Sequence, residues 1–241
     1  MAKPVESVMP PGQHVSGSAE PLLEPGDRLS RIEFERRYER MPRLKKAELI
    51  EGVVYMPSPV RVKQHAIPHS QLAGWLSHYV AVTPGVECAD NATIRLDLDN
   101  EPQPDLVLMK HPEKGGRARV STDDYIEGPP ELVVEIVGSS AAYDLHQKKG
   151  VYRRNGISEY LVWITGEPRL IWWELREDEY REIVGTPEGL LASRVFPGLW
   201  LDVPALLRGD MNSVLTTLGR GLESAEHGVF VGAASGGARN G

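Results

Sequence analysis

The sequence predicts a single α/β domain in which helices flank a central mixed β-sheet. A length of 241 residues with a hydrophobic content of 41 % is enough for one good core. Helical and strand periodicities alternate along residues 27–210. Within that span, residues 131–164 show a strand, a helix and a second strand in succession, which is typical of a crossover between parallel strands.

The first elements add a helix and a hairpin ahead of the sheet. Ser30 is a candidate N-cap for a short amphipathic helix over residues 31–38. Residues 47–56, AELIEGVVYM, predict two short strands with a turn at Glu51-Gly52. From residue 65 to residue 82, apolar side chains recur at three- and four-residue steps, which predicts a substantial core helix.

Strand patterns then dominate the chain. They occur at residues 92–97, 105–109, 131–137, 159–164, 169–175 and 180–184. The 131–137 run is rich in β-branched residues and suits a strand that is buried on both faces. Residues 143–155 carry the helical pattern of the crossover, and the last two strands predict a C-terminal hairpin that extends the sheet.

The two ends of the chain predict little structure. Residues 1–26 are rich in proline, and the final segment GVFVGAASGGARNG is poor in large apolar groups that could offset the entropy of ordering. We therefore expect a disordered tail over residues 1–26, a folded domain over residues 27–210, and a mostly disordered tail over residues 211–241.

Composition indicates the cellular compartment in which we expect the protein. No apolar run approaches the roughly 18 residues that a membrane span needs, and the N-terminus lacks the apolar stretch of a secretory signal. The single cysteine, Cys88, excludes an internal disulfide and a cysteine-based zinc site. We therefore expect a soluble, cytoplasmic protein that has no membrane partner.

Charge gives two opposing indications about nucleic acid. The formal net charge of −7 counts against a general DNA binder, which usually presents a basic field to phosphates. Two clusters of lysine and arginine nevertheless leave room for a local basic patch. They comprise Arg36, Arg37, Arg40, Arg43, Lys45 and Lys46, followed by Lys148, Lys149, Arg153 and Arg154.

One carboxylate lies where a strand should be buried. Burying a lone ionised carboxylate costs several kcal/mol, so Glu135 needs a cation, a metal ion or hydrogen-bond donors. Asp105 follows Pro104 at the start of a neighbouring strand, and two such carboxylates can share Mg²⁺ or Mn²⁺. Lys148, on the following helix, can reach the same strand ends and orient a water molecule or a phosphate.

At this point the chain resembles a known group. The resemblance rests on the segments AELIEGVVYMPSP, PQPDLVLM, PPELVVEIVGSSAAYDLHQKKGVYRRNGISEYLVW and VFPGLWLDVPALL, and on the histidine that opens the helix after the first of them. Over about residues 30–207 these blocks resemble the Uma family, a former domain of unknown function within the PD-(D/E)xK restriction-endonuclease-like superfamily. The resemblance implies a restriction-endonuclease-like core and an Mg²⁺- or Mn²⁺-dependent endonuclease that acts on nucleic acid, with DNA expected first.

The resemblance also assigns roles to residues. It implies that Asp105 and Glu135 hold the metal ion and that Lys148 is a migrated catalytic lysine, because the usual lysine position two residues after Glu135 holds Val137. It adds Glu48 as a further acidic group and matches His65 and Tyr152 to typical positions of the family. The chain departs from the family at Gly138, commonly proline, and at Ala66, often glutamine.

Several other interpretations stay open on the sequence alone. Asp105 could be a turn residue at the start of a strand, and Glu135 could form a buried structural ion pair with Lys148. His65 and His69 have a spacing that can bind zinc, although surface or capping histidines are favoured. The whole domain could be a nuclease fold that binds or regulates without turnover. A two-fold homodimer is a further expectation, since many nucleases cut duplexes in that form.

Overall fold

A six-stranded mixed sheet forms the centre of the molecule. The computed structural model describes residues 21–56, 59–138 and 142–235. The strand order is β11-β10-β9-β8-β5-β3, in which β8 and β9 are parallel and all other neighbours are antiparallel. The bounds are β3 Val86–Asp90, β5 Leu106–Lys110, β8 Leu132–Val137, β9 Glu159–Ile164, β10 Arg169–Arg176 and β11 Glu179–Glu182. The predicted α/β class with a central mixed sheet is confirmed.

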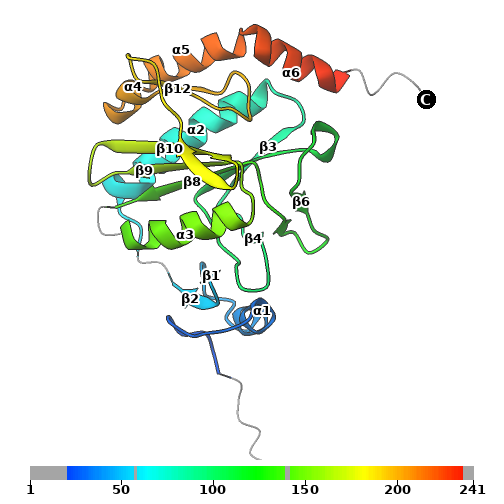
Figure 1. Cartoon of the computed structure of the whole chain (residues 1–241). Helices are drawn as coiled ribbons and strands as arrows, with labels where there is room; N and C mark the ends of the chain where they lie inside the picture. The colour runs from blue at the N-terminus through cyan, green and yellow to red at the C-terminus, as the bar shows by residue number, and fades with distance from the viewer. Residues whose placement is uncertain (1–20, 57–58, 139–141, 236–241) are drawn as a thin grey trace, which may run out of the picture.

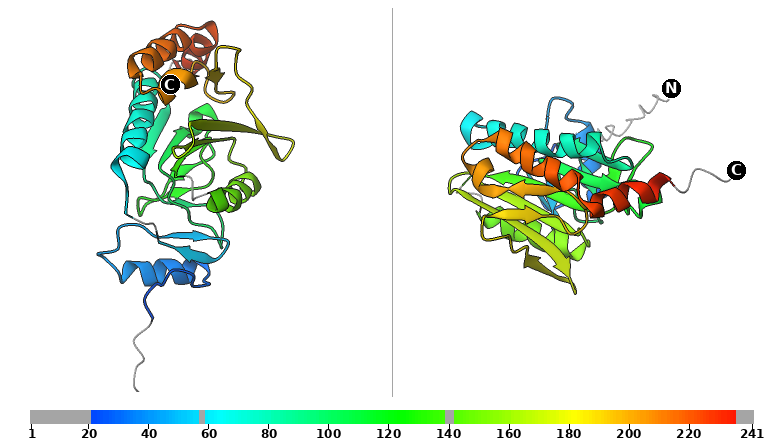
Figure 2. Two further views of the ribbon diagram at one scale, coloured as in Figure 1. Left: turned by 90° about the vertical axis from the view of Figure 1, so that its left-hand side faces the viewer. Right: turned by 90° about the horizontal axis from the view of Figure 1, so that it is seen from above.

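Helices cover both faces of this sheet (Figure 1). Helix α2 (Ile67–Ala81) follows a π-helical turn, η1 (Val62–Ala66), and buries its apolar stripe on one face. Helix α3 (Ala142–Arg154) packs on the other face and completes the predicted parallel crossover from β8 to β9. Figure 2 shows the sheet between the two helices. Trp163 and Trp172, on β9 and β10, are buried in the core.

The N-terminal helix and hairpin form a small layer below the sheet (Figure 1). Ser30 caps α1 (Arg31–Glu39), and β1 (Glu48–Ile50) pairs with β2 (Val53–Tyr55). The turn is where it was predicted, because Glu51 and Gly52 both adopt positive φ, at 52° and 71°. A separate cluster of buried side chains holds this layer together: Leu23, Phe34, Ala47, Leu49 and Val54.

A three-stranded sheet lies beside the central one. It consists of β4 (Ile94–Arg95), β6 (Arg119–Val120) and β7 (Ile126–Glu127), so the strand predicted over residues 92–97 is only two residues long. Asp97 ends it early, because its carboxylate accepts hydrogen bonds from the backbone N–H of Asp99 and the side chain of Asn100. Those bonds favour a turn over a continued strand.

The predicted C-terminal tail is wrong for most of its length. After β12 (Leu190–Ala192), β13 (Trp200–Asp202) and α4 (Val203–Leu207), the chain forms α5 (Met211–Leu222) and α6 (Ala225–Ser235). Val214 and Leu218, one helical turn apart, are buried against the main core. Gly221 serves packing rather than flexibility, because a Cβ there would lie 2.2 Å from the carbonyl oxygen of Gly198. Residues 236–241 lie outside the described part of the chain.

The predicted N-terminal tail also needs correction at its inner end. Leu23 is 3 % exposed and packs in the cluster of the N-terminal layer. Gly26 donates its backbone N–H to the carbonyl of Val54. Residues 1–20 lie outside the described residues. None of the helices that the structure describes combines the length and the apolar character needed to span a bilayer.

Candidate active site

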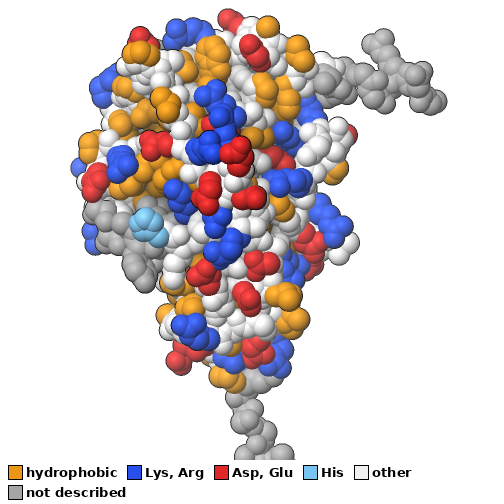
Figure 3. All heavy atoms as spheres, in the orientation of Figure 1, with side chains coloured by type: hydrophobic (Ala, Val, Ile, Leu, Met, Phe, Trp, Pro, Cys, Tyr) orange, Lys and Arg blue, Asp and Glu red, His pale blue; other side chains and the backbone are white. Residues whose placement is uncertain are grey.

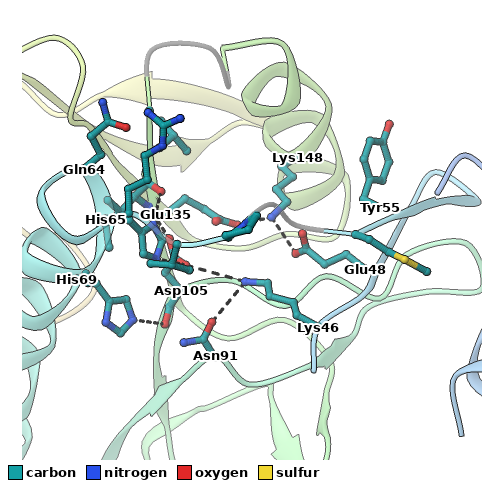
Figure 4. Close-up of a pocket in the computed structure, with 18 of the residues that line it drawn as sticks. Lys46, Glu48, Tyr55, Gln64, His65, His69, Asn91, Asp105, Glu135 and Lys148 are labelled. Carbon is teal, nitrogen blue, oxygen red and sulfur yellow. Dashed lines mark hydrogen bonds and ion pairs between the residues drawn. The ribbon is translucent and has the colours of Figure 1, made fainter. Parts of the chain in front are cut away.

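A cavity of about 590 Å³ opens between the N-terminal layer and one end of the central sheet. Its walls come from the β1–β2 hairpin, from η1 and the start of α2, from the adjoining strands β5 and β8, and from α3. The predicted site residues Glu48, His65, Asp105, Glu135 and Lys148 all line it. Figure 4 shows their side chains converging from these separate elements.

The sheet register places the two predicted metal ligands side by side. Leu106 pairs with Val134 across the antiparallel strands β5 and β8, so extending the register by one position sets Asp105 opposite Glu135. Directly opposed residues of an antiparallel pair project to the same face. Both residues therefore lie on the face that α3 covers, at the edge where the cavity begins.

Asp105 is held from three directions. It is 3 % exposed, and its Oδ2 accepts a 2.7 Å hydrogen bond from the backbone N–H of Ile136. Its Oδ1 lies 3.3 Å from His65 Nε2 and 4.0 Å from Lys46 Nζ. Burial alone would raise the pKa of Asp105, but the hydrogen bond and charge of His65, with the smaller contributions of the Ile136 N–H and Lys46, hold it below its ordinary value.

Glu135 and Glu48 share one ammonium group. Lys148 Nζ lies 2.8 Å from Oε1 of each carboxylate, and Tyr152 donates its hydroxyl to Glu135 Oε1 at 2.9 Å. Burial raises the pKa of Glu135 to about 7; Lys148 opposes that rise, and the carboxylates of Asp105 and Glu48 reinforce it. The pKa of Lys148 is raised although burial opposes the charge, because the two carboxylates stabilise its charged form.

The hairpin supplies Glu48 through strand periodicity. Alternate residues of a strand point to one face, and Lys46, Glu48 and Ile50 line the cavity while Ala47 and Leu49 pack in the N-terminal layer. Glu48 Oε1 also accepts a 2.7 Å hydrogen bond from the backbone N–H of Gln103.

His65 connects the two strands that carry the carboxylates. Its Nδ1 lies 3.1 Å from the carbonyl oxygen of Ile136, and its Nε2 faces Asp105. The hydrogen bond to Asp105 raises the pKa of His65, which favours an imidazolium that donates from both nitrogens. His65 stands in η1, and such π-helical turns often mark functional positions.

His69 belongs to the same group and is a residue that sequence reasoning set aside. Its ring stacks on that of His65 at 5.7 Å, and its Nε2 lies 3.0 Å from Asp90 Oδ1 and 3.2 Å from the Asp105 carbonyl oxygen. Lys46 and Asn91 also line the cavity unpredicted. The available signal for Lys46 was its i, i+2 spacing from Glu48 on a strand.

The carboxylates fit a hard divalent cation. Glu48, Asp105 and Glu135 gather around one cavity, where Lys148 and His65 balance part of their mutual repulsion and a divalent cation would balance more of it. Within residues 21–56, 59–138 and 142–235, no three Asp, Glu, His or Cys side chains are arranged to hold a metal ion by themselves. Mg²⁺ typically uses one or two carboxylates and fills its other positions with water and substrate phosphate, which suits the pair Asp105 and Glu135.

Carboxylates balance part of the positive charge in the two basic clusters. Arg36 and Arg37 form ion pairs with Glu33, and Arg154 pairs with Glu51. Lys148 is turned into the cavity. On the face shown in Figure 3, blue lysine and arginine side chains are interspersed with red aspartate and glutamate.

Comparisons with known proteins agree with this architecture. No curated protein matches the chain. A crystal structure described as a putative nuclease belonging to DUF820 from Anabaena variabilis ATCC 29413 has the same fold, with a TM-score of 0.56 and 14 % sequence identity. The match covers 72 % of this chain and 96 % of that one. The model of the Uma2 family, described as putative restriction endonuclease, matches residues 33–204, which is more than half of the chain, and the chain therefore belongs to that family.

Proposed function

We propose that the protein hydrolyses phosphodiester bonds in nucleic acid, using Mg²⁺ or Mn²⁺ held by Asp105 and Glu135. DNA is the substrate that we favour over RNA. The observation that carries this proposal is the cross-strand placement of the two carboxylates in a cavity that Lys148 and His65 also line. The family and the structural neighbour support a nuclease. The chemistry of the oxygen ligands supports the metal.

Each residue then has a defined task. The bound cation would supply Lewis acidity, lowering the pKa of a water molecule and offsetting charge on the scissile phosphate. Lys148 fixes Glu135 and Glu48 at 2.8 Å and keeps a positive charge at the reacting end of the sheet. His65 orients Asp105, while Tyr152 holds Glu135 from within the core.

The decisive experiment measures cleavage by the full chain of single-stranded DNA, duplex DNA and RNA with Mg²⁺, with Mn²⁺ and with EDTA. Wild type should cleave at least one of these only when metal is present, and Asp105→Asn should not. Asp123→Asn is a matched control, because Asp123 is an exposed aspartate that pairs with Arg95 away from the cavity. Metal-independent cleavage, or equal activity of the Asp105→Asn variant, would contradict the proposal.

A second candidate is a nuclease fold that binds or regulates without turnover. The net charge of −7 and the paired arginines of the surface favour it. In that case nucleic acid or a protein partner would bind and no metal would produce cleavage.

For the cleavage of duplex DNA we further propose that the protein acts in the cytoplasm as a homodimer. Sedimentation of the protein with and without DNA tests the dimer.

A further inference from the structure

Two lysines reach the cavity, and they are held very differently. Lys148 donates to two carboxylates at 2.8 Å, so both of its strong contacts are charged. Lys46 lies 3.3 Å from the neutral amide oxygen of Asn91 and 4.0 Å from Asp105 Oδ1, at the outer limit of an ion pair. Figure 4 shows the Lys46 ammonium pointing toward Asp105 and Asn91, on the other side of Glu48 from Lys148.

This difference decides which lysine can bind a substrate. Withdrawing Lys148 would leave Glu48 and Glu135, 7 % and 5 % exposed, without their shared cation, and an unpaired buried charge is strongly unfavourable. Redirecting Lys46 gives up one hydrogen bond to a neutral group and one long ion pair. The side chain of Lys46 is also more accessible than that of Lys148, at 22 % against 14 %.

The position of Lys46 suits an anion next to the reacting centre. Lys46 lies two residues before Glu48, the first residue of β1, and both side chains line the cavity. Because alternate residues of an extended chain point to the same face, the hairpin fixes the direction of the Lys46 side chain. Several surface arginines are already occupied by carboxylates, as described above, so an anionic substrate gains more from a cation inside the cavity. A lysine ammonium binds phosphate as a compact point charge.

We propose that Lys46 binds a phosphate group of the nucleic-acid substrate, while Lys148 stays between Glu48 and Glu135. This inference rests on the proposed nuclease function and divides the two lysines between substrate binding and organisation of the carboxylates. A cation bound at Asp105 would weaken the pull of that carboxylate on Lys46. Metal should therefore strengthen, and not compete with, phosphate binding at Lys46.

The test uses binding without turnover. Fluorescence anisotropy of a short labelled single-stranded DNA is measured in EDTA over a range of salt concentrations for wild type, Lys46→Gln, Lys46→Arg and Lys45→Gln. Lys45 is the adjacent, exposed lysine, so its substitution is the matched control. Lys46→Gln should weaken binding about tenfold and reduce the slope of log K against log salt by about 0.7, the value of one lost phosphate contact on a single strand.

Lys46→Arg should restore most of the affinity and the salt slope, and Lys45→Gln should match wild type. If wild type also cleaves with metal, Lys46→Gln should raise KM more than it lowers kcat. Equal salt slopes for Lys46→Gln and Lys45→Gln, or no binding of DNA by wild type, would overturn the phosphate site. Binding that depends on Lys46 without any cleavage would uphold the site and refute the proposed hydrolysis, so the two failures are distinguishable.

Discussion

Glu135 and Glu159 are two buried carboxylates on neighbouring parallel strands, and only one of them faces a cavity. Glu135 lies inside the apolar run of β8 and Glu159 begins that of β9; each is at most 5 % exposed, and burial raises the pKa of each to about 7. The donors to Glu159 in the described part of the chain are all neutral: Trp172 Nε1, Ser193 Oγ and the backbone N–H groups of Arg194 and Val195. Glu135 depends on Lys148, Tyr152 and the balance of nearby carboxylates.

The comparison shows that burial alone does not identify a functional carboxylate. Fixed neutral donors satisfy Glu159 completely and tie the loop before β13 to the sheet. Glu135 instead lines open volume together with Lys148, Glu48 and Asp105, the setting in which we propose that a cation binds beside its present partners. We therefore propose that Glu159 stabilises the fold and that Glu135 takes part in the chemistry, and substitutions can test each half of this proposal.

The largest expected effect is on activity. Glu135→Gln removes the charge that would hold the cation and should lower kcat/KM for metal-dependent cleavage by about a thousandfold. Glu159→Gln keeps an acceptor within its donor group and should leave kcat/KM within about threefold of wild type. Steady-state kinetics on the best substrate check both variants. Equal losses would mean that the two carboxylates do not differ in role.

The next largest effect is on stability, and here we expect it from substitution of Glu159. Glu159→Leu removes the acceptor shared by four donors, although the Val195 N–H still reaches Ser193 Oγ, and should lower the free energy of unfolding by about 3 kcal/mol. Glu159→Gln should lower it by less, because an amide oxygen still accepts. Urea denaturation followed by circular dichroism measures the difference. A Glu159→Leu variant as stable as wild type would show that these bonds contribute little.

Metal should distinguish the same two positions without any substrate. At a Mn²⁺ concentration a hundredfold above Kd, binding to the folded state alone stabilises it by about 2.7 kcal/mol. Thermal unfolding should show that gain for wild type and Glu159→Gln, and none for Glu135→Gln. If Mn²⁺ leaves the melting temperature of wild type unchanged, the result would instead favour a purely structural ion pair of Glu135 and Lys148.

Local patterns in the sequence predict much of this molecule, and contacts between distant segments explain the rest. The strands, α2 and the hairpin follow from periodicity and turn residues, and Glu135 stands out because an apolar strand rarely tolerates a charge. Glu159 begins an apolar strand instead of lying inside one, and its donors from Trp172 and residues 193–195 are brought to it only by the fold. Helix α5 falls within the segment predicted to be a tail, because its burial against the main core and the close approach of Gly221 to Gly198 join segments that local patterns do not relate. The spacing of Lys46 from Glu48 is a local signal, but its contacts with Asn91 and Asp105 come from segments far along the chain.

Glu101 extends the comparison to a third buried carboxylate, which lies beneath α1 and outside the cavity. It is 1 % exposed, and burial, followed by its hydrogen bond to Glu35, raises its pKa to about 8. The groups that act on it are Glu35, Arg31, Arg95, Tyr38 and Tyr125. Folding therefore favours the protonated form of the Glu101 carboxyl group. Well below pH 4.5 this group is protonated in both the folded and the unfolded chain.

Stability should fall as the pH rises, because the unfolded chain releases this proton near pH 4.5 and the folded chain only near pH 8. Between pH 6 and pH 8 the loss should be about 2 kcal/mol. Glu101→Gln can still donate to Glu35 but carries no titrating proton, so its unfolding free energy should stay flatter over that range. Urea titrations at both pH values measure this, and parallel losses in the two proteins would place the proton elsewhere.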